Sequence, residues 1–197
     1  MMQKRKPLRL ALMVMGAMLG SSISLTTWAT SPASPAMLSH TCNGCHGTDG
    51  NSAGLSNPTI AGLDVEYFEI AMTQFKSGER PSSIMGRLAK GYTDEQIKAM
   101  AAFFASKKFV AAKQTADSGK AKQGKVLHDK SCEKCHGSGS KAGENGALAG
   151  QWKEYLELTF GEFRSGKRKG PDKMKRPLAA LSDADIDALI NYYVSQK

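Results

Sequence analysis

Apolar residues recur at three- and four-residue steps in two matching stretches of the chain, residues 65–76 and 152–164. In the first stretch, Tyr67, Ile70 and Phe75 fall on one face of an α-helix at this spacing. Each stretch ends at a Ser-Gly pair, which is typical of a helix C-terminus. No stretch alternates between apolar and polar residues as a half-buried strand would. The pattern therefore predicts an all-α fold.

A further helix is predicted near the end of each half of the chain. Thr93 and Ser182 are hydroxyl residues followed three positions later by Gln96 and Asp185, which is the spacing of a capping box at a helix N-terminus. One apolar stripe follows each of these starts. The stripes consist of Ile97, Met100, Ala101 and Phe104, and of Ile186, Leu189, Ile190 and Tyr193.

These elements belong to an internal duplication, because blocks of the chain recur about 90 residues later. Residues 67–80 match residues 155–168, and residues 85–97 match residues 174–186. The repeat predicts two tandem helical domains. The expected segments are a signal peptide (1–29), a first domain (30–108), a linker (109–122) and a second domain (123–197).

The four cysteines of the chain form two Cys-x-x-Cys-His motifs, at residues 42–46 and 132–136, and this is the attachment pattern of a c-type haem. Two thiols one helical turn apart can form thioether bonds with the two vinyl groups of one haem. The adjacent histidine then lies under the iron as an axial ligand. We therefore expect two covalently bound haem c groups. The attachment cysteines are Cys42, Cys45, Cys132 and Cys135, and the iron-ligating histidines are His46 and His136.

Three other uses of four cysteines are less consistent with the pattern. Disulfides would not explain a histidine directly after each pair. A zinc site would have to join two clusters that lie about 90 residues apart, each with three donors in five residues. A thioredoxin-like redox pair would follow a strand, and no strand is predicted here.

Each iron needs a second axial ligand, and the duplication indicates one methionine in each domain. Met174 is the single methionine of the second domain, and its equivalent in the first domain is Met85. We expect both to lie in loops, and we predict His/Met ligation, which raises the reduction potential relative to two histidine ligands. Ligation by two histidines would need His40 and His128, which lie within four residues of a cysteine and are not in equivalent positions.

The second ring nitrogen of an iron-ligating histidine usually donates its proton to a carbonyl group. In the first domain we expect the carbonyl of Pro58 to accept from His46. The corresponding stretch of the second domain starts at Gly146 and lacks a proline. The carbonyl could remain there on a looser backbone, so equal potentials of the two haems do not follow from the duplication.

The N-terminal 29 residues have the three parts of an export signal: a basic start, an apolar stretch at residues 10–19 and a polar region that ends at small residues. We expect cleavage after Ala29 and a periplasmic location. An uncleaved membrane anchor is the alternative, because residues 10–29 carry no charge. No later segment is apolar enough to span a bilayer, so no stable membrane insertion is expected after cleavage.

The formal net charge of +9 does not indicate a nucleic-acid partner. Four positive charges lie in the first nine residues, so 9 − 4 leaves +5 after cleavage. The propionates of two haems would bring this balance close to zero. No stripe of interleaved aromatic and basic residues is present either, so no nucleic acid is expected as a partner.

Several strings resemble known cytochromes. Two class I cytochrome c units in tandem are similar to the cytochrome c4 group, and the chain more closely resembles the di-haem cytochrome subunit of flavocytochrome c sulfide dehydrogenase. The strings that carry this resemblance lie at residues 37–38, 75–79, 83–92, 127–136, 149–152 and 155–156. The resemblance covers nearly the whole chain after residue 29, and the strings at 83–92 and 127–136 are the most specific.

The resemblance implies a subunit that docks on an FAD-bearing flavoprotein, which oxidises sulfide. The two haems would face each other across a pseudo-twofold interface and pass electrons to a soluble acceptor. On this interpretation the chain is not an enzyme on its own. A free di-haem shuttle to a terminal oxidase is the alternative. An enzyme with an open haem is disfavoured, because Met85 and Met174 occupy equivalent positions.

Overall fold

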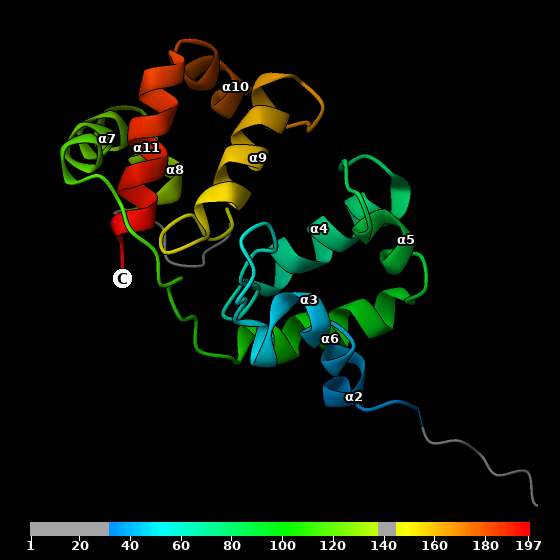
Figure 1. Cartoon of the computed structure of the whole chain (residues 1–197). Coiled ribbons are helices and arrows are strands. Elements are labelled where there is room, and N and C mark those ends of the chain that lie inside the picture. Colours follow the sequence, from blue (N-terminus) through cyan, green and yellow to red (C-terminus); the bar gives the residue numbers. More distant parts are fainter. Residues whose placement is uncertain (1–31, 138–144) are drawn as a thin grey trace, which may run out of the picture. The chain divides into compact units, whose positions relative to one another are not determined.

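The computed structural model describes residues 32–137 and 145–197, and within these ranges the chain forms helices and no β-strand (Figure 1). The predicted signal peptide at 1–29 lies outside the described residues. Residues 33–197 form one compact unit. The elements are α2 (Pro35–His40), α3 (Asn43–His46), η1 (Thr48–Gly50), α4 (Val65–Ser77), α5 (Met85–Ala89), α6 (Asp94–Ala105), α7 (Ser118–Ser131), α8 (Glu133–His136), α9 (Lys153–Arg164), α10 (Asp172–Ala179) and α11 (Asp183–Ser195).

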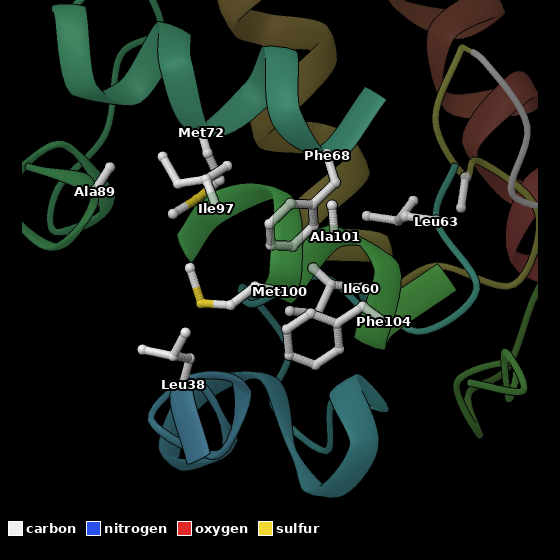
Figure 2. Close-up of a cluster of buried hydrophobic side chains, with 11 residues drawn as sticks. Leu38, Ile60, Leu63, Phe68, Met72, Ala89, Ile97, Met100, Ala101 and Phe104 are labelled. Carbon is white, nitrogen blue, oxygen red and sulfur yellow. The ribbon is translucent and has the colours of Figure 1, made fainter. Parts of the chain in front are cut away.

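The first half of the unit has its core between α2, α4 and α6 (Figure 2). Phe68 of α4 stacks on Phe104 of α6, with ring centroids 5.6 Å apart. Phe103 meets Phe104 edge-on at 5.3 Å. The buried members of this first core are Leu38, Ile60, Leu63, Phe68, Met72, Ala89, Ile97, Met100, Ala101, Phe104 and Ala147.

The second half packs around α11, which is in close contact with α7 and also contacts α9 (Figure 1). Gly124 of α7 sits so close to α11 that a Cβ atom there would lie 2.0 Å from the carbonyl oxygen of Ala188. The buried members of this second core are Leu156, Phe160, Leu178, Ile186, Leu189, Ile190, Tyr192, Tyr193 and Val194.

Both predicted capping boxes are confirmed. The Thr93 hydroxyl accepts from the backbone N–H of Gln96 at 3.2 Å, and the Gln96 side chain accepts from the backbone N–H of Thr93 at 2.9 Å. Ser182 and Asp185 make the same reciprocal pair at the start of α11, at 3.2 and 2.9 Å. These caps satisfy N–H groups that have no partner within the helix, and thereby fix where α6 and α11 begin.

The expectation that the two methionines lie in loops was wrong. Met85 is the first residue of α5, and Met174 is the third residue of α10. The helix α5 has only 5 residues, which is too short for a three- to four-residue periodicity to show in the sequence. In α10 the sequence signal was hidden because the helix is mostly polar and carries Pro177 in its last turn.

The segment between the halves is held by specific hydrogen bonds. Asn51 receives a bond from the backbone N–H of Val110 at 2.8 Å, and its own amide donates to the carbonyl of Lys108 at 3.0 Å. Gln114 donates to the carbonyl of Gln151 at 2.6 Å. Helix α7 begins at Ser118, inside the linker predicted at residues 109–122. The exact domain boundaries stay a prediction.

A buried amide pair joins the two halves. The side-chain oxygen of Gln151 accepts from the backbone N–H of Thr59 at 3.0 Å, and its side-chain N–H donates to the carbonyl of Thr59 at 2.7 Å. Both residues are almost fully buried. Trp152 adds a bond from its ring N–H to the carbonyl of Ser52 at 3.1 Å. A buried polar pair is favourable only when both partners are satisfied, so this contact fixes the register between the halves.

Candidate haem-attachment sites

Each Cys-x-x-Cys-His motif forms a single helical turn of the same geometry. In the first motif the backbone N–H of His46 donates to the carbonyl of Cys42 at 2.9 Å, and His136 donates to Cys132 at the same distance. The turns are α3 and α8, and each follows directly on its first cysteine. The similarity of the two turns means that each can bring two sulfurs and one imidazole to a common face.

The four cysteines are free thiols. Cys45 and Cys135 are exposed, whereas Cys42 and Cys132 are partly buried. Burial raises the pKa of both Cys42 and Cys132, which keeps the thiols protonated at neutral pH. No cluster of three or more donors suited to a metal ion exists among the described residues. The two motifs therefore share one pattern, in which the first cysteine is partly buried and the second is exposed.

The imidazole of His46 is oriented by the carbonyl that the sequence predicted. Its Nδ1 lies 2.8 Å from the carbonyl oxygen of Pro58, which can only accept, so Nδ1 carries the proton. The other nitrogen, Nε2, then has a lone pair. Burial lowers the pKa of His46 in spite of this hydrogen bond, so the ring is neutral at pH 7. A neutral ring with a free Nε2 lone pair fits an axial iron ligand.

The imidazole of His136 is held differently. Its Nδ1 is buried and has no hydrogen-bond partner among the described residues. Burial lowers the pKa of His136, so this ring is also neutral at pH 7. Close to it, the side chain of Asn145 donates to the carbonyl of Cys135 at 2.6 Å. The two histidines therefore have different hydrogen-bond surroundings.

Each candidate methionine lies in the same half as its motif. Met85 and Cys42 both pack against the first core, and Met174 and Cys132 both pack against the second. All four side chains are partly buried. The fold thus brings the first cysteine of each motif and the candidate methionine of the same half to a common core.

The two remaining histidines have other roles. Both ring nitrogens of His128 are engaged in hydrogen bonds, to the hydroxyl of Tyr193 at 2.9 Å and the carbonyl of Gly137 at 2.7 Å. His40 is exposed and lies edge-on to the ring of Phe103, with centroids 5.9 Å apart. Neither arrangement suits an iron ligand.

A reciprocal pair of arginines lies between the halves, and sequence reasoning missed it. Arg80 of the first half donates to the hydroxyl of Tyr155 in the second half at 3.3 Å, and Arg168 donates to Tyr67 at 3.4 Å. Each guanidinium is 8% exposed and stacks on a phenylalanine of its own half. The repeated blocks at residues 67–80 and 155–168 contained this signal, because they carry both the tyrosine and the arginine.

The carboxylate of Glu162 lies near enough to the buried arginine pair for its charge to act on both guanidinium groups. No Asp or Glu forms an ion pair with Arg80 or Arg168 within the described residues. Burial alone would lower the pKa of Arg80, but the neighbouring Tyr155 and Tyr67 raise it above its ordinary value. With two guanidinium groups and one nearby carboxylate, this buried cluster has an excess of positive charge, which would suit an anionic group.

The sequence of the chain is similar to those of known cytochromes. Residues 119–192 match the family model of cytochrome c oxidase, cbb3-type, subunit III. The cytochrome subunit of sulfide dehydrogenase from Chlorobaculum tepidum is 53% identical over 68 residues, which are 34% of this chain and 61% of that relative. Cytochrome c4 of Azotobacter vinelandii is 31% identical over 172 residues, with 77% of this chain and 82% of that protein covered.

A solved structure also matches. The crystal structure of reduced recombinant cytochrome c4 from Pseudomonas stutzeri is similar with a TM-score of 0.71 and 28% identity, covering 80% of this chain and 94% of that chain. The all-α fold with two tandem cytochrome domains, as predicted from the sequence, is confirmed by this match. Within the described residues, no helix is long and apolar enough to cross a bilayer.

Proposed function

Because the chain belongs to the cytochrome c4 family, we propose that it is the electron-transfer subunit of a flavoprotein sulfide dehydrogenase and carries two haem c groups. Catalysis on sulfide resides on the FAD-bearing partner, and this chain passes the electrons to a soluble acceptor. The chain acts in the periplasm after cleavage behind Ala29. The observation that carries the haem assignment is the pair of identical Cys-x-x-Cys-His turns, each next to its own core and methionine.

The first site uses Cys42 and Cys45 for thioether bonds and His46 and Met85 as iron ligands. The second site uses the equivalent residues, which are Cys132, Cys135, His136 and Met174. When bound, a haem c supplies a one-electron Fe(III)/Fe(II) couple, and His/Met ligation places its potential above that of a bis-histidine haem.

The residues around the two sites hold these donor atoms in place and shield them from water. The carbonyl of Pro58 fixes the tautomer of His46, so that Nε2 presents its lone pair. The buried guanidinium groups of Arg80 and Arg168 would offset part of the negative charge that a bound haem brings with its propionates.

The identity of 53% with the cytochrome subunit of a sulfide dehydrogenase favours a flavoprotein partner. That match spans only 34% of this chain, so it does not decide against a free di-haem shuttle. Cytochrome c4 proteins match over 77% of the chain at 31% identity, which favours a free di-haem shuttle to a terminal oxidase. The two functions share every haem-binding residue and differ in whether a flavoprotein is bound.

The test is to purify the tagged chain from the periplasm of its own host and to record the absorption spectrum under anaerobic conditions. We expect a co-purifying flavoprotein with extractable FAD, and rapid appearance of reduced haem after sulfide is added. The control is the chain separated from its partner, which should be reduced by sulfide much more slowly. A lone di-haem protein that sulfide does not reduce would refute the sulfide dehydrogenase assignment and support the free shuttle.

A further inference from the structure

His128 is a buried histidine that the haem assignments do not use. It lies on α7 and is fully buried, between the rings of Tyr192 and Tyr193, whose centroids are 5.2 and 5.5 Å from its own. Its Nδ1 lies 2.9 Å from the hydroxyl of Tyr193, and its Nε2 lies 2.7 Å from the carbonyl oxygen of Gly137. A fully satisfied polar pair inside an apolar core needs a reason, because an apolar pair of similar size would pack equally well.

The direction of both hydrogen bonds follows from the chemistry of the partners. The carbonyl of Gly137 can only accept, so Nε2 of His128 carries the proton. Nδ1 then has a lone pair and accepts from the hydroxyl of Tyr193. Burial raises the pKa of Tyr193, so its hydroxyl stays protonated and remains a donor. Both ring nitrogens of His128 are thus engaged.

These contacts reach both ends of the second haem-attachment turn. Gly137 directly follows His136, the predicted iron ligand. At the other end of the turn, the backbone N–H of Cys132 donates to the carbonyl of His128 at 2.8 Å. Cys132 also packs against the second core, of which Tyr193 is a buried member. The His128 side chain therefore holds the backbone directly after the turn, whereas the bond to Cys132 is the last backbone bond of α7 and does not depend on the side chain.

The first half provides an internal comparison. Aligning the two motifs places Leu38 where the second half has His128, and aligning the two final helices places Phe104 where the second half has Tyr193. Leu38 and Phe104 are both buried in the first core. Both members of the pair therefore change together, from two apolar residues to two that hydrogen-bond to each other.

The difference between the halves coincides with the difference between their histidine ligands. In the first half the carbonyl of Pro58 orients His46 directly. In the second half Nδ1 of His136 has no partner among the described residues, while the backbone next to it is held by His128. We propose that His128, with Tyr193 as its hydrogen-bond donor, is a positioning residue that sets the orientation of the His136 ring on the second haem. This inference rests on the proposed haem attachment.

The test uses the oxidised, mature di-haem protein and its electron paramagnetic resonance spectrum, because the signal of each low-spin haem depends on the orientation of its ligand rings. In the double variant H128L/Y193F, which copies the Leu38 and Phe104 pair, we expect one of the two signals to shift or broaden and the other to stay unchanged. The intact mass of the wild-type protein, which reports its number of haems, checks the proposed function separately.

The variant H128Q is the matched control, because a glutamine amide can still accept from Tyr193 and donate to the carbonyl of Gly137. We expect H128Q to keep both wild-type signals. Loss of the second haem from the double variant, but not from H128Q, would be the strongest form of the expected result. Wild-type signals in the double variant, even with a lowered melting temperature, would overturn the proposal. A disturbance by H128Q as large as that of the double variant would do the same.

Discussion

Replacing Gly124 with alanine would place a methyl group inside the contact between α7 and α11. The added Cβ atom would lie 2.0 Å from the carbonyl oxygen of Ala188 and 2.8 Å from Cβ of Tyr192. Ordinary van der Waals contact begins at 3.4 Å, so the two helices would have to move apart by about 1.4 Å (3.4 − 2.0). The nearest atom is backbone, so no side-chain rotation can relieve the clash.

The magnitude follows from two opposing effects. Overpacking a core costs about 1–3 kcal/mol, and a backbone clash belongs at the upper end of this range. Alanine gains about 1 kcal/mol over glycine in a helix interior. The net loss for Gly124→Ala is therefore about 2 kcal/mol, which corresponds to about 4–8 °C in melting temperature for a unit of this size.

The assay is a thermal melt of the holoprotein followed by circular dichroism, and Gly161→Ala on α9 is the matched control. No atom lies within 4 Å of the position that a Cβ would take at Gly161. Only the helix preference should act there, so this variant should gain about 0.5–1 kcal/mol. The two substitutions are chemically the same and should have opposite signs. If Gly124→Ala is neutral or stabilising, then α7 and α11 do not approach each other as described.

Two further predictions concern the contact between the halves and the start of α11. Gln151→Leu leaves the buried N–H and carbonyl of Thr59 without partners, so it should lower the free energy of unfolding in urea by about 2–4 kcal/mol. Trp152→Phe loses one hydrogen bond to Ser52 and should lower it by about 1 kcal/mol. Hydrogen bonds from the side chain and backbone of Ser182 lower the pKa of Asp185 in the folded protein. The ionised carboxylate therefore stabilises the fold at every pH above the pKa that Asp185 has in the unfolded chain. This stabilisation is lost as the pH falls through the pKa of Asp185 in the folded protein. The difference in melting temperature between wild type and Asp185→Asn should therefore shrink on acidification; a difference that stays constant down to about pH 2 would contradict this cause.

Local signals predicted the helices and the attachment turns well. The stretch at 65–76 became α4, Val65–Ser77, and the stretch at 152–164 became α9, Lys153–Arg164. Gly78 ends α4 in the left-handed conformation, with φ of 82°, as the Ser-Gly pair indicated. These features depend on residues close together in the chain, so a single sequence contains them.

Contacts between distant residues could not be read in the same way. The bond from Arg80 to Tyr155 joins residues 75 positions apart, and it exists only because the two halves pack together. The pairing of His128 with Tyr193 depends likewise on the crossing of α7 and α11. The duplication offered an indirect signal, because a polar pair stands where the first half has Leu38 and Phe104.

The roles of the haem-binding residues depend on chemistry that the fold makes possible. The structure brings Cys42 and Met85 to one core and Cys132 and Met174 to the other, and it orients His46 through Pro58. Which of these atoms bind iron stays a prediction from the motif, the duplication and this arrangement.

The most direct test of the account is the intact mass of the mature protein, measured after denaturation and treatment with a chelator and acid acetone, which removes haem that is not covalently bound. The account predicts a single species carrying two haems, and replacing both Cys132 and Cys135 with serine should remove one of them while the other stays. A mature chain without covalent haem, or one that keeps two haems after that double replacement, would contradict it.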